Sequence, residues 1–140
     1  MVLSSIKVLL TVMIVMTSAM LRNPNAAFGR IHVHIYNFLD LGPTLTVHCW
    51  SKNDDLGEQE LPPKDSWEFS FKLDFFGRTR FDCTFKWNDE VHRFPIYVQM
   101  RDNWACLNCT WVIYQAGPCR QNTGSNDVCY HWHDKEETIS

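Results

Sequence analysis

Apolar and polar residues alternate with a period of two along most of the chain after residue 30. Successive side chains of a β-strand point to opposite faces of its sheet, so this alternation predicts strands with one buried face and one wet face. The alternating segments are 31–36, 44–50, 67–73, 80–87, 94–101 and 109–114. After the N-terminal segment, no stretch has the apolar stripe of a helix, and the chain is therefore predicted to be all-β.

Residues typical of turns separate these segments. They stand at 41–43, 53–57, 62–65, 76–78, 88–90 and 117–118. Short links favour antiparallel pairing, so the predicted fold is a small antiparallel β-sandwich, with a small closed barrel as the alternative. The acidic turn at 53–57 has some features of a calcium loop, but Lys52 breaks the ligand spacing. We expect an ordinary turn there, with Gly57 at positive φ.

The N-terminal segment has the pattern of a secretory signal peptide. Lys7 precedes an apolar run from Val8 to Met20, and the small residues Thr17, Ser18 and Ala19 stand near the end of this run. This run is shorter than the roughly 20 residues that a membrane-spanning helix needs, which disfavours the alternative of a retained anchor. We predict a signal peptide at 1–19, with cleavage after Ala19 or as late as residue 27, and a secreted, extracellular product.

The charge balance argues against several classes of partner. Without Lys7, 12 basic residues remain against 16 acidic ones, a formal charge of −4. A nucleic-acid-binding protein would carry a basic face, and a protein held on an anionic membrane would carry a polybasic stretch. We expect no nucleic-acid partner and no membrane insertion, and a monomer.

Six cysteines follow the signal segment, and an even number in a small exported domain indicates disulfides. Three bridges can form in 15 connectivities, among which spacing does not choose. Cys106 and Cys109 could instead bind zinc together with Cys129 and nearby histidines, but export through an oxidising compartment favours disulfides. We expect no metal. The predicted disulfide cysteines are Cys49, Cys83, Cys106, Cys109, Cys119 and Cys129.

No pattern in the sequence indicates catalysis. His32, His34 and His48 lie at the polar-facing positions of predicted strands, where a histidine needs no special role. His32 and His34 could imitate the histidine pair of a secreted ribonuclease, but no other residue supports this reading, and the chain has no Gly-x-Ser-x-Gly elbow. We predict no enzymatic activity, no catalytic residue and no cofactor.

Seven short motifs occur in order between residues 31 and 119: VHIYN (33–37), LTVHCWSK (45–52), DDLG (54–57), WEFSF (67–71), FDCTFKW (81–87), CTWVI (109–113) and GPC (117–119). In this order they resemble the plant self-incompatibility S-protein homologue family. The resemblance implies a disulfide-stapled β-sandwich over 28–120. Cys129 lies beyond the usual last cysteine of the family, in a polar C-terminal tail at 121–140, and we expect it to tether the middle of this tail. The resemblance also suggests that the first and last family cysteines, Cys49 and Cys119, pair with each other.

The resemblance further implies a plant extracellular ligand that acts in cell–cell recognition through a plasma-membrane receptor protein. A sandwich presents its loops at two ends, so receptor contacts are expected in the turns at 52–60, 75–80, 88–93 and 101–104. The candidate receptor-contact residues are Asp54, Asp55, Glu58, Arg78, Asp89, Glu90, Arg101 and Trp104.

Two further features remain open in the sequence. Trp67, Trp87 and Trp111 fall on inward positions, whereas Trp50 and Trp132 are expected to be exposed and could stack on sugar rings. The alternative function is therefore an extracellular carbohydrate-binding wall module. Asn108 begins the only Asn-x-Ser/Thr glycosylation sequence, and the adjacent cysteine and strand start weigh against its use.

Overall fold

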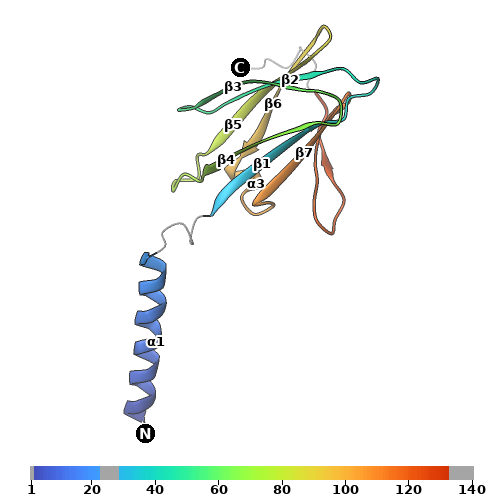
Figure 1. Ribbon diagram of the computed structural model, residues 1–140. Coiled ribbons are helices and arrows are strands. Elements are labelled where there is room, and N and C mark those ends of the chain that lie inside the picture. Colours follow the sequence, from blue (N-terminus) through green and yellow to red (C-terminus); the bar gives the residue numbers. More distant parts are fainter. Residues whose placement is uncertain (1, 23–28, 133–140) are drawn as a thin grey trace.

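The computed structural model describes residues 2–22 and 29–132 of the chain (Figure 1). The described part contains a helix α1, nine strands and a short helix α3. Their bounds are α1 Val2–Arg22, β1 Arg30–Asn37, β2 Leu45–Trp50, β3 Asp55–Leu61, β4 Ser66–Lys72, β5 Arg80–Trp87, β6 Glu90–Val98, α3 Gln99–Asp102, β7 Asn108–Tyr114, β8 Gly117–Arg120 and β9 Val128–Cys129.

The strands form two sheets that pack as a β-sandwich, which confirms the predicted fold class (Figure 1). One sheet has the order β4-β1-β7-β8-β9 and the other has the order β3-β2-β5-β6. Most neighbouring strands are antiparallel, but β1 and β7 are parallel. Antiparallel pairing was expected from short links, and that argument does not apply to β1 and β7 because most of the domain separates them in the chain.

The inward residues of both sheets form one hydrophobic core. Alternation along β1 buries every second residue from Ile31 to Ile35, as the sequence predicts. Aromatic rings join the two sheets: Phe71 lies 4.5 Å from Phe81, and Phe94 lies 5.3 Å from Trp111, between ring centroids. Such aromatic pairs stabilise a core beyond the area that they bury.

Strand β3 was missed because its sequence reads as a turn. Asp55 pairs with Trp50 of β2, and the register between the two strands shifts between His48 and Trp50. The expected turn is therefore shortened, and a strand begins at Asp55. Gly57 has a φ of +74°, which confirms the expected positive φ. β3 is an edge strand with mostly exposed side chains, and such a strand shows little apolar alternation.

The predicted strand at 94–101 is wrong at its end. β6 stops at Val98 and the chain turns into α3, which leaves Met100 83% exposed instead of buried. The side chain of Asp102 accepts a hydrogen bond from the backbone N–H of Val98 at 2.8 Å. This bond ties the last residue of α3 back to the residue that ends β6.

All six cysteines are paired, but not as the resemblance suggests. The bridges are Cys49–Cys83, Cys106–Cys109 and Cys119–Cys129, so the expected pairing of Cys49 with Cys119 is wrong. Cys49 lies directly opposite Cys83 in the β2–β5 pair, whereas Cys119 belongs to the other sheet. Cys119–Cys129 likewise joins opposed residues, of β8 and β9. These two bridges therefore staple neighbouring strands within a sheet.

The structured domain continues past residue 120. β9 pairs with β8, and the backbone N–H of Tyr130 donates to the carbonyl of Pro118 at 2.9 Å. A Cβ atom at Gly117 would lie 1.8 Å from the Tyr130 carbonyl oxygen, so only glycine fits there. The expected tether at Cys129 is confirmed. The end of the expected tail, residues 133–140, lies outside the described residues.

The N-terminal apolar segment forms α1, whose side chains from Val2 to Met16 are exposed. The expected cleavage after Ala19 falls within this helix, and the later limit at residue 27 lies outside the described residues. Among the described residues, no helix combines the length and apolar character that crossing a membrane requires.

Candidate functional site at one end of the sandwich

Three connections meet at the end of the sandwich where β1 begins. β2 and β4 end there, β5 and β7 begin there, and β6 runs into α3 there. We call this the groove end, formed by residues 51–54, 73–79 and 99–107. The opposite end, the far end, carries the turns at 38–44, 62–65, 88–89 and 115–116. Gln99 links two of the groove-end connections, since its side-chain amide donates to the Asp74 carbonyl at 3.1 Å and accepts from the Thr79 N–H at 3.2 Å.

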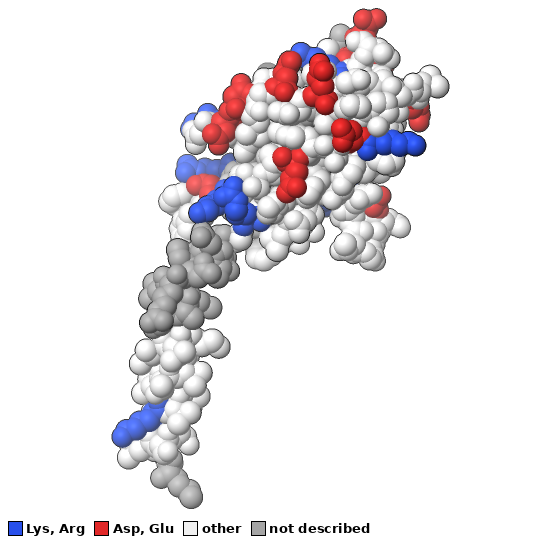
Figure 2. Space-filling model, viewed as in Figure 1, with Lys and Arg blue, Asp and Glu red and all other residues white. Residues whose placement is uncertain are grey.

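A surface groove of about 860 Å³ opens at this end between the β2–β3 turn and the β4–β5 loop. Five cationic side chains line it, namely Arg30, Lys52, Lys72, Arg78 and Arg80. Figure 2 shows Lys and Arg side chains gathered at the lower end of the domain, where the chain enters β1, whereas Asp and Glu are more numerous toward β3. The protein as a whole is acidic, so this gathering of cations comes from the fold.

The acidic residues of the groove are mostly engaged. Asp82 is buried and accepts two hydrogen bonds from Arg80, both at 3.0 Å, and these bonds raise the pKa of Arg80. The pKa of Asp74 is lowered overall. Desolvation of the carboxylate acts in the opposite direction, but hydrogen bonds from the Arg78 side chain and from backbone N–H groups outweigh it.

Three of the cations form no ion pair with a described residue. Arg30 donates to the hydroxyl and the carbonyl of Ser70, while Lys52 and Lys72 are exposed side chains without a carboxylate within bridging distance in the described part. Asp54 faces the same groove and is exposed. The groove therefore offers net positive charge to a partner.

Trp50 lines the groove as well, at the end of β2. The guanidinium of Arg93 lies 5.0 Å from its ring centroid, and the ring is half-buried. The expectation that Trp50 is an exposed aromatic is therefore met only in part, because Arg93 covers one face.

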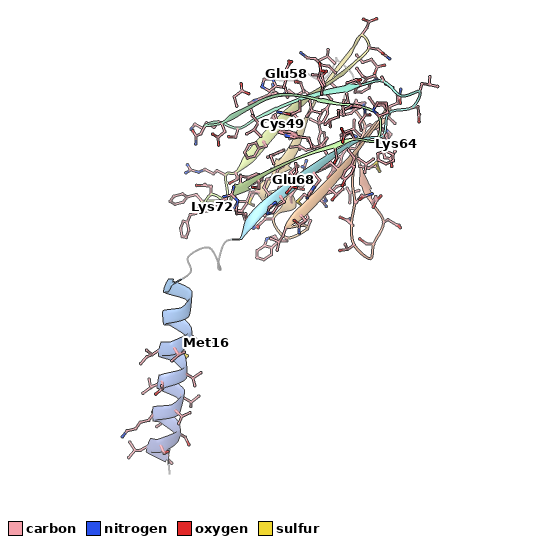
Figure 3. The ribbon with its side chains drawn as sticks, in the orientation of Figure 1. Met16, Cys49, Glu58, Lys64, Glu68 and Lys72 are labelled. Carbon is pink, nitrogen blue, oxygen red and sulfur yellow. A yellow bond between two sulfur atoms is a disulfide. The ribbon has the colours of Figure 1, made fainter. Side chains whose placement is uncertain are left out.

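The fold brings together some of the predicted contact residues and separates others. Asp54, Asp55, Arg78 and Trp104 lie at the groove end and are exposed. Glu58 is exposed in the middle of the edge strand β3 (Figure 3). Asp89 and Glu90 are exposed in the β5–β6 turn at the far end, so they cannot share a contact with the groove.

Arg101 was expected in an exposed loop, and that expectation is wrong. Its side chain is only 24% exposed and donates to both carboxylate oxygens of Asp102, at 2.9 and 2.7 Å. Its guanidinium also lies over the rings of Phe94 and Trp111, 5.3 Å from each centroid. Arg120, which is buried, donates to the same carboxylate. Arg101 therefore helps to build the support beneath the groove end.

The tryptophans divide between core and surface. Trp87 and Trp111 are buried as predicted, and Trp67 packs partly buried against the core. The expected exposure of Trp132 is wrong, because its ring packs 5.5 Å from Phe85 and 4.8 Å from His92, between centroids. Trp132 therefore closes the edge of the core.

The strand histidines lie beside carboxylates. His32 and His34 flank Glu68 on the outer side of β1, with nitrogen–oxygen distances of 2.8 and 3.6 Å. The pKa of Asp55 is lowered, mainly because its carboxylate accepts a hydrogen bond from the Gly57 backbone N–H. His48, whose ring nitrogen lies 2.6 Å from a carboxylate oxygen of Asp55, adds to this effect. None of these histidines lines the groove. Asn108, the glycosylation candidate, is exposed at the start of β7.

The groove cations Arg30, Lys52, Lys72 and Arg80 were not singled out as contact residues, although Lys52 and Arg80 fall within the predicted contact turns at 52–60 and 75–80. The four cations belong to four different segments, so no charge run marks them in the sequence. The alternation pattern places Lys72 and Arg80 near strand ends. The β1–β4 register sets Arg30 opposite Lys72, and the packing of the two sheets brings this pair to the same groove as Lys52 and Arg80.

Comparisons with known proteins agree with this fold. The family profile described as plant self-incompatibility protein S1 matches residues 32–132. S-protein homolog 2 of Arabidopsis thaliana is 47% identical over 107 residues, which cover 71% of this chain and 66% of that protein. S-protein homolog 20 of the same plant is 42% identical over 109 residues, covering 75% of this chain and 78% of the relative.

A solved structure shows the same fold. It belongs to an SPH (self-incompatibility protein homologue) protein, from what is described as a widespread family of small, highly stable, secreted proteins from plants. The two structures agree with a TM-score of 0.56 at 22% sequence identity, over 78% of this chain and 99% of the other. By its matched residues and its relatives, the chain belongs to the plant self-incompatibility protein S1 family.

Proposed function

We propose that this protein is secreted and acts as an extracellular recognition ligand, and that its groove end binds a plasma-membrane receptor protein. The apolar N-terminal segment with a basic residue ahead of it supports secretion, as does the description of the SPH relative as secreted. The mature chain then begins after Ala19 or within the next eight residues. Three disulfides suit a small domain that must remain folded outside the cell.

The groove is the observation that carries the proposed binding mode. Loops supported by a rigid sheet are the usual place for recognition, and here the β2–β3 turn and the β4–β5 loop border one concave surface. Arg30, Lys52 and Lys72 offer charges that no described carboxylate neutralises. The complementary surface of the receptor is therefore acidic, and its attraction to the groove would raise the association rate.

A wall polysaccharide is the second candidate partner, and Trp50 is the observation that favours it. An aromatic ring beside cationic side chains suits an acidic sugar chain, with the ring stacking on a sugar and the cations binding carboxylates. Trp132 no longer contributes to this alternative because it packs on the core. A polysaccharide partner predicts binding that depends on Trp50 and needs no membrane protein.

Reversing the groove charge should weaken binding to plant plasma membranes. We expect the double variant Lys52→Glu/Lys72→Glu to bind about tenfold more weakly, because two attractive charges become repulsive toward an acidic partner. Lys64→Glu is the matched control, since Lys64 is exposed in the turn before β4, and Lys72 ends that strand at the groove end (Figure 3). The measurement is saturation binding of the labelled secreted protein to plasma-membrane fractions.

The two candidate partners give different results in parallel assays. Binding to a membrane receptor should be lost when the membranes are treated with protease, and it should fall with the groove variants while Lys64→Glu binds normally. Equal binding by the groove variants and the parent protein would rule out the groove as the receptor contact. Tight binding to wall polysaccharides that Trp50→Ala abolishes would make the carbohydrate module the better account.

A further inference from the structure

Large apolar side chains are exposed together at the groove end. Phe75 and Phe76 in the β4–β5 loop are 78% and 73% exposed, and Met100 and Trp104 in the connection from β6 to β7 are 83% and 94% exposed. Leu107 follows at 60%. Single exposed apolar residues are ordinary, but a group of this size on adjoining loops marks an interaction surface.

These side chains belong to one surface because the two loops are bound to each other. The Gln99 N–H donates to the Thr79 carbonyl at 3.0 Å, and the Gln99 side chain bonds to both Asp74 and Thr79. A Cβ atom placed at Gly77 would lie 3.9 Å from the Met100 sulfur, so Met100 adjoins the loop that carries the phenylalanines. The Cys106–Cys109 bridge and the buried Asp102 hold the segment of Trp104 in place. We call Phe75, Phe76, Met100, Trp104 and Leu107 the apolar tip.

Cations border the apolar tip. The Arg78 guanidinium lies 5.0 Å from the Phe76 ring centroid, and Lys72 ends the strand that leads into the same loop. Arg30 and Arg80 lie on the adjoining wall of the groove. Of the acids that line the groove, Asp74 is paired with Arg78 and Asp82 with Arg80, while Asp54 at the opposite rim forms no ion pair with a described residue. The surroundings of the apolar tip are therefore positive overall.

The rest of the molecule carries the opposite charge. Edge strand β3 presents Glu58 and Glu60, and the turn between β5 and β6 presents Asp89 and Glu90. An anionic surface would therefore repel most orientations of the protein and attract the groove end. The charge distribution therefore favours contact through the end that carries the apolar tip.

We infer that the apolar tip and its cations form a docking surface for the anionic phospholipid bilayer. Aromatic and aliphatic side chains enter the interfacial region of the bilayer, while Lys72, Arg78 and Arg30 bind lipid phosphates or carboxylates at the headgroup level. Docking is peripheral and involves loop residues only. It would concentrate the protein at the cell surface and turn the groove toward membrane proteins.

The combination of residues favours a bilayer over a protein pocket as the occupant. The exposed residues come from two loops at one end of the domain, and cations border them on the side of the groove, as in interfacial membrane anchors. Cations scattered over segments around residues 30, 72 and 78 form no polybasic stretch, so the sequence gives no sign of this surface. The inference does not depend on the receptor proposal, because vesicles without protein test it alone.

The test is flotation of the protein secreted by plant cells, with its N-terminus determined, on vesicles of phosphatidylcholine and phosphatidylserine. We expect binding that falls at high salt and on pure phosphatidylcholine vesicles. Trp104→Ser should weaken partitioning about tenfold, because a buried aromatic side chain is lost from the interface. Lys72→Gln should weaken it about fivefold, as expected for one cation near an anionic surface.

Two matched variants at the far end serve as controls. Leu41→Ser removes a fully exposed apolar side chain from the β1–β2 turn, and Lys64→Gln removes a cation from the β3–β4 turn. Both should bind vesicles as the parent protein does. Trp104 and Lys72 are exposed, so thermal unfolding of all four variants should match that of the parent and exclude a general loss of structure.

Two results would overturn the inference. One is the absence of vesicle binding at low salt while plasma membranes still bind the protein in a protease-sensitive way, which would assign the apolar tip to a protein partner. The other is vesicle binding that the groove-end and far-end variants weaken equally. Vesicle binding with the expected pattern, but with no protease-sensitive binding to plasma membranes, would keep the bilayer surface and reject the receptor.

Discussion

Asp102→Ala should lower the free energy of unfolding by about 3–5 kcal/mol, as expected for breaking a buried charge pair. The Asp102 side chain is 1% exposed, and its carboxylate accepts hydrogen bonds from Arg101, from Arg120 and from the Val98 backbone N–H. Removal of this carboxylate leaves the guanidinium groups of Arg101 and Arg120 without their ion-pair partner. The Arg120 side chain is only 7% exposed, so water cannot replace the lost partner there. Chemical denaturation of the purified variant measures the loss.

Two comparisons make the Asp102 prediction specific. Asp89→Ala removes an exposed carboxylate at the far end and should change stability by no more than about 0.5 kcal/mol. Asp102→Leu combined with Arg120→Met should recover part of the loss, because the buried positive charge of Arg120 is removed together with its partner. A loss below about 1 kcal/mol for Asp102→Ala would mean that the arginines find other partners, and that this network does not hold α3.

Trp87→Ala should cost about 3–5 kcal/mol, a large share of the stability of a domain of this size. Trp87 is 3% exposed on the inner face of β5, and its ring lies 4.9 Å from His92 and 6.0 Å from Trp132, between centroids. Truncation to alanine leaves a cavity beside Trp132. The midpoint of thermal or denaturant unfolding measures the effect.

Trp104→Ala is the matched control for Trp87, because the same side chain is removed from a position that is 94% exposed. Its unfolding should shift by no more than about 0.5 kcal/mol. If both variants lose the same small amount, the inner face of β5 has been assigned incorrectly. A large loss for Trp104→Ala would mean instead that this residue packs against the domain.

The sandwich could be predicted from the sequence because its central strands each bury one face. The alternation along β1, β2 and β5 survives in the structure almost residue for residue. Edge strand β3 was missed since most of its side chains are exposed, and the short strands β8 and β9 contain too few residues to show a period. Met100 follows the alternation of β6 but lies beyond its end, where hydrogen bonds of Asp102 and Gln99 turn the chain.

The disulfide pairing and the groove could not be predicted, because both depend on strand register. Cys83 is the partner of Cys49 because the β2–β5 register places them opposite each other, and no spacing in the sequence encodes that register. Arg101 looks like a loop cation in the sequence, but the buried carboxylate beside it and the rings around it draw it inward. The predicted contact residues Asp54, Asp55, Arg78 and Trp104 do gather at one end, whereas Asp89 and Glu90 do not.

Photo-cross-linking from each end of the sandwich tests most directly that the groove end is the recognition surface. A photoreactive residue replaces Asp54 at the groove rim in one variant and Asp89 in the far-end turn in the other, both at exposed positions. Each variant is bound to plant plasma membranes, irradiated and analysed for adducts with membrane proteins. The account predicts a discrete protein adduct from position 54 that excess unlabelled protein prevents, and none from position 89. An adduct from position 89 alone, or adducts only with wall polysaccharide, would contradict it.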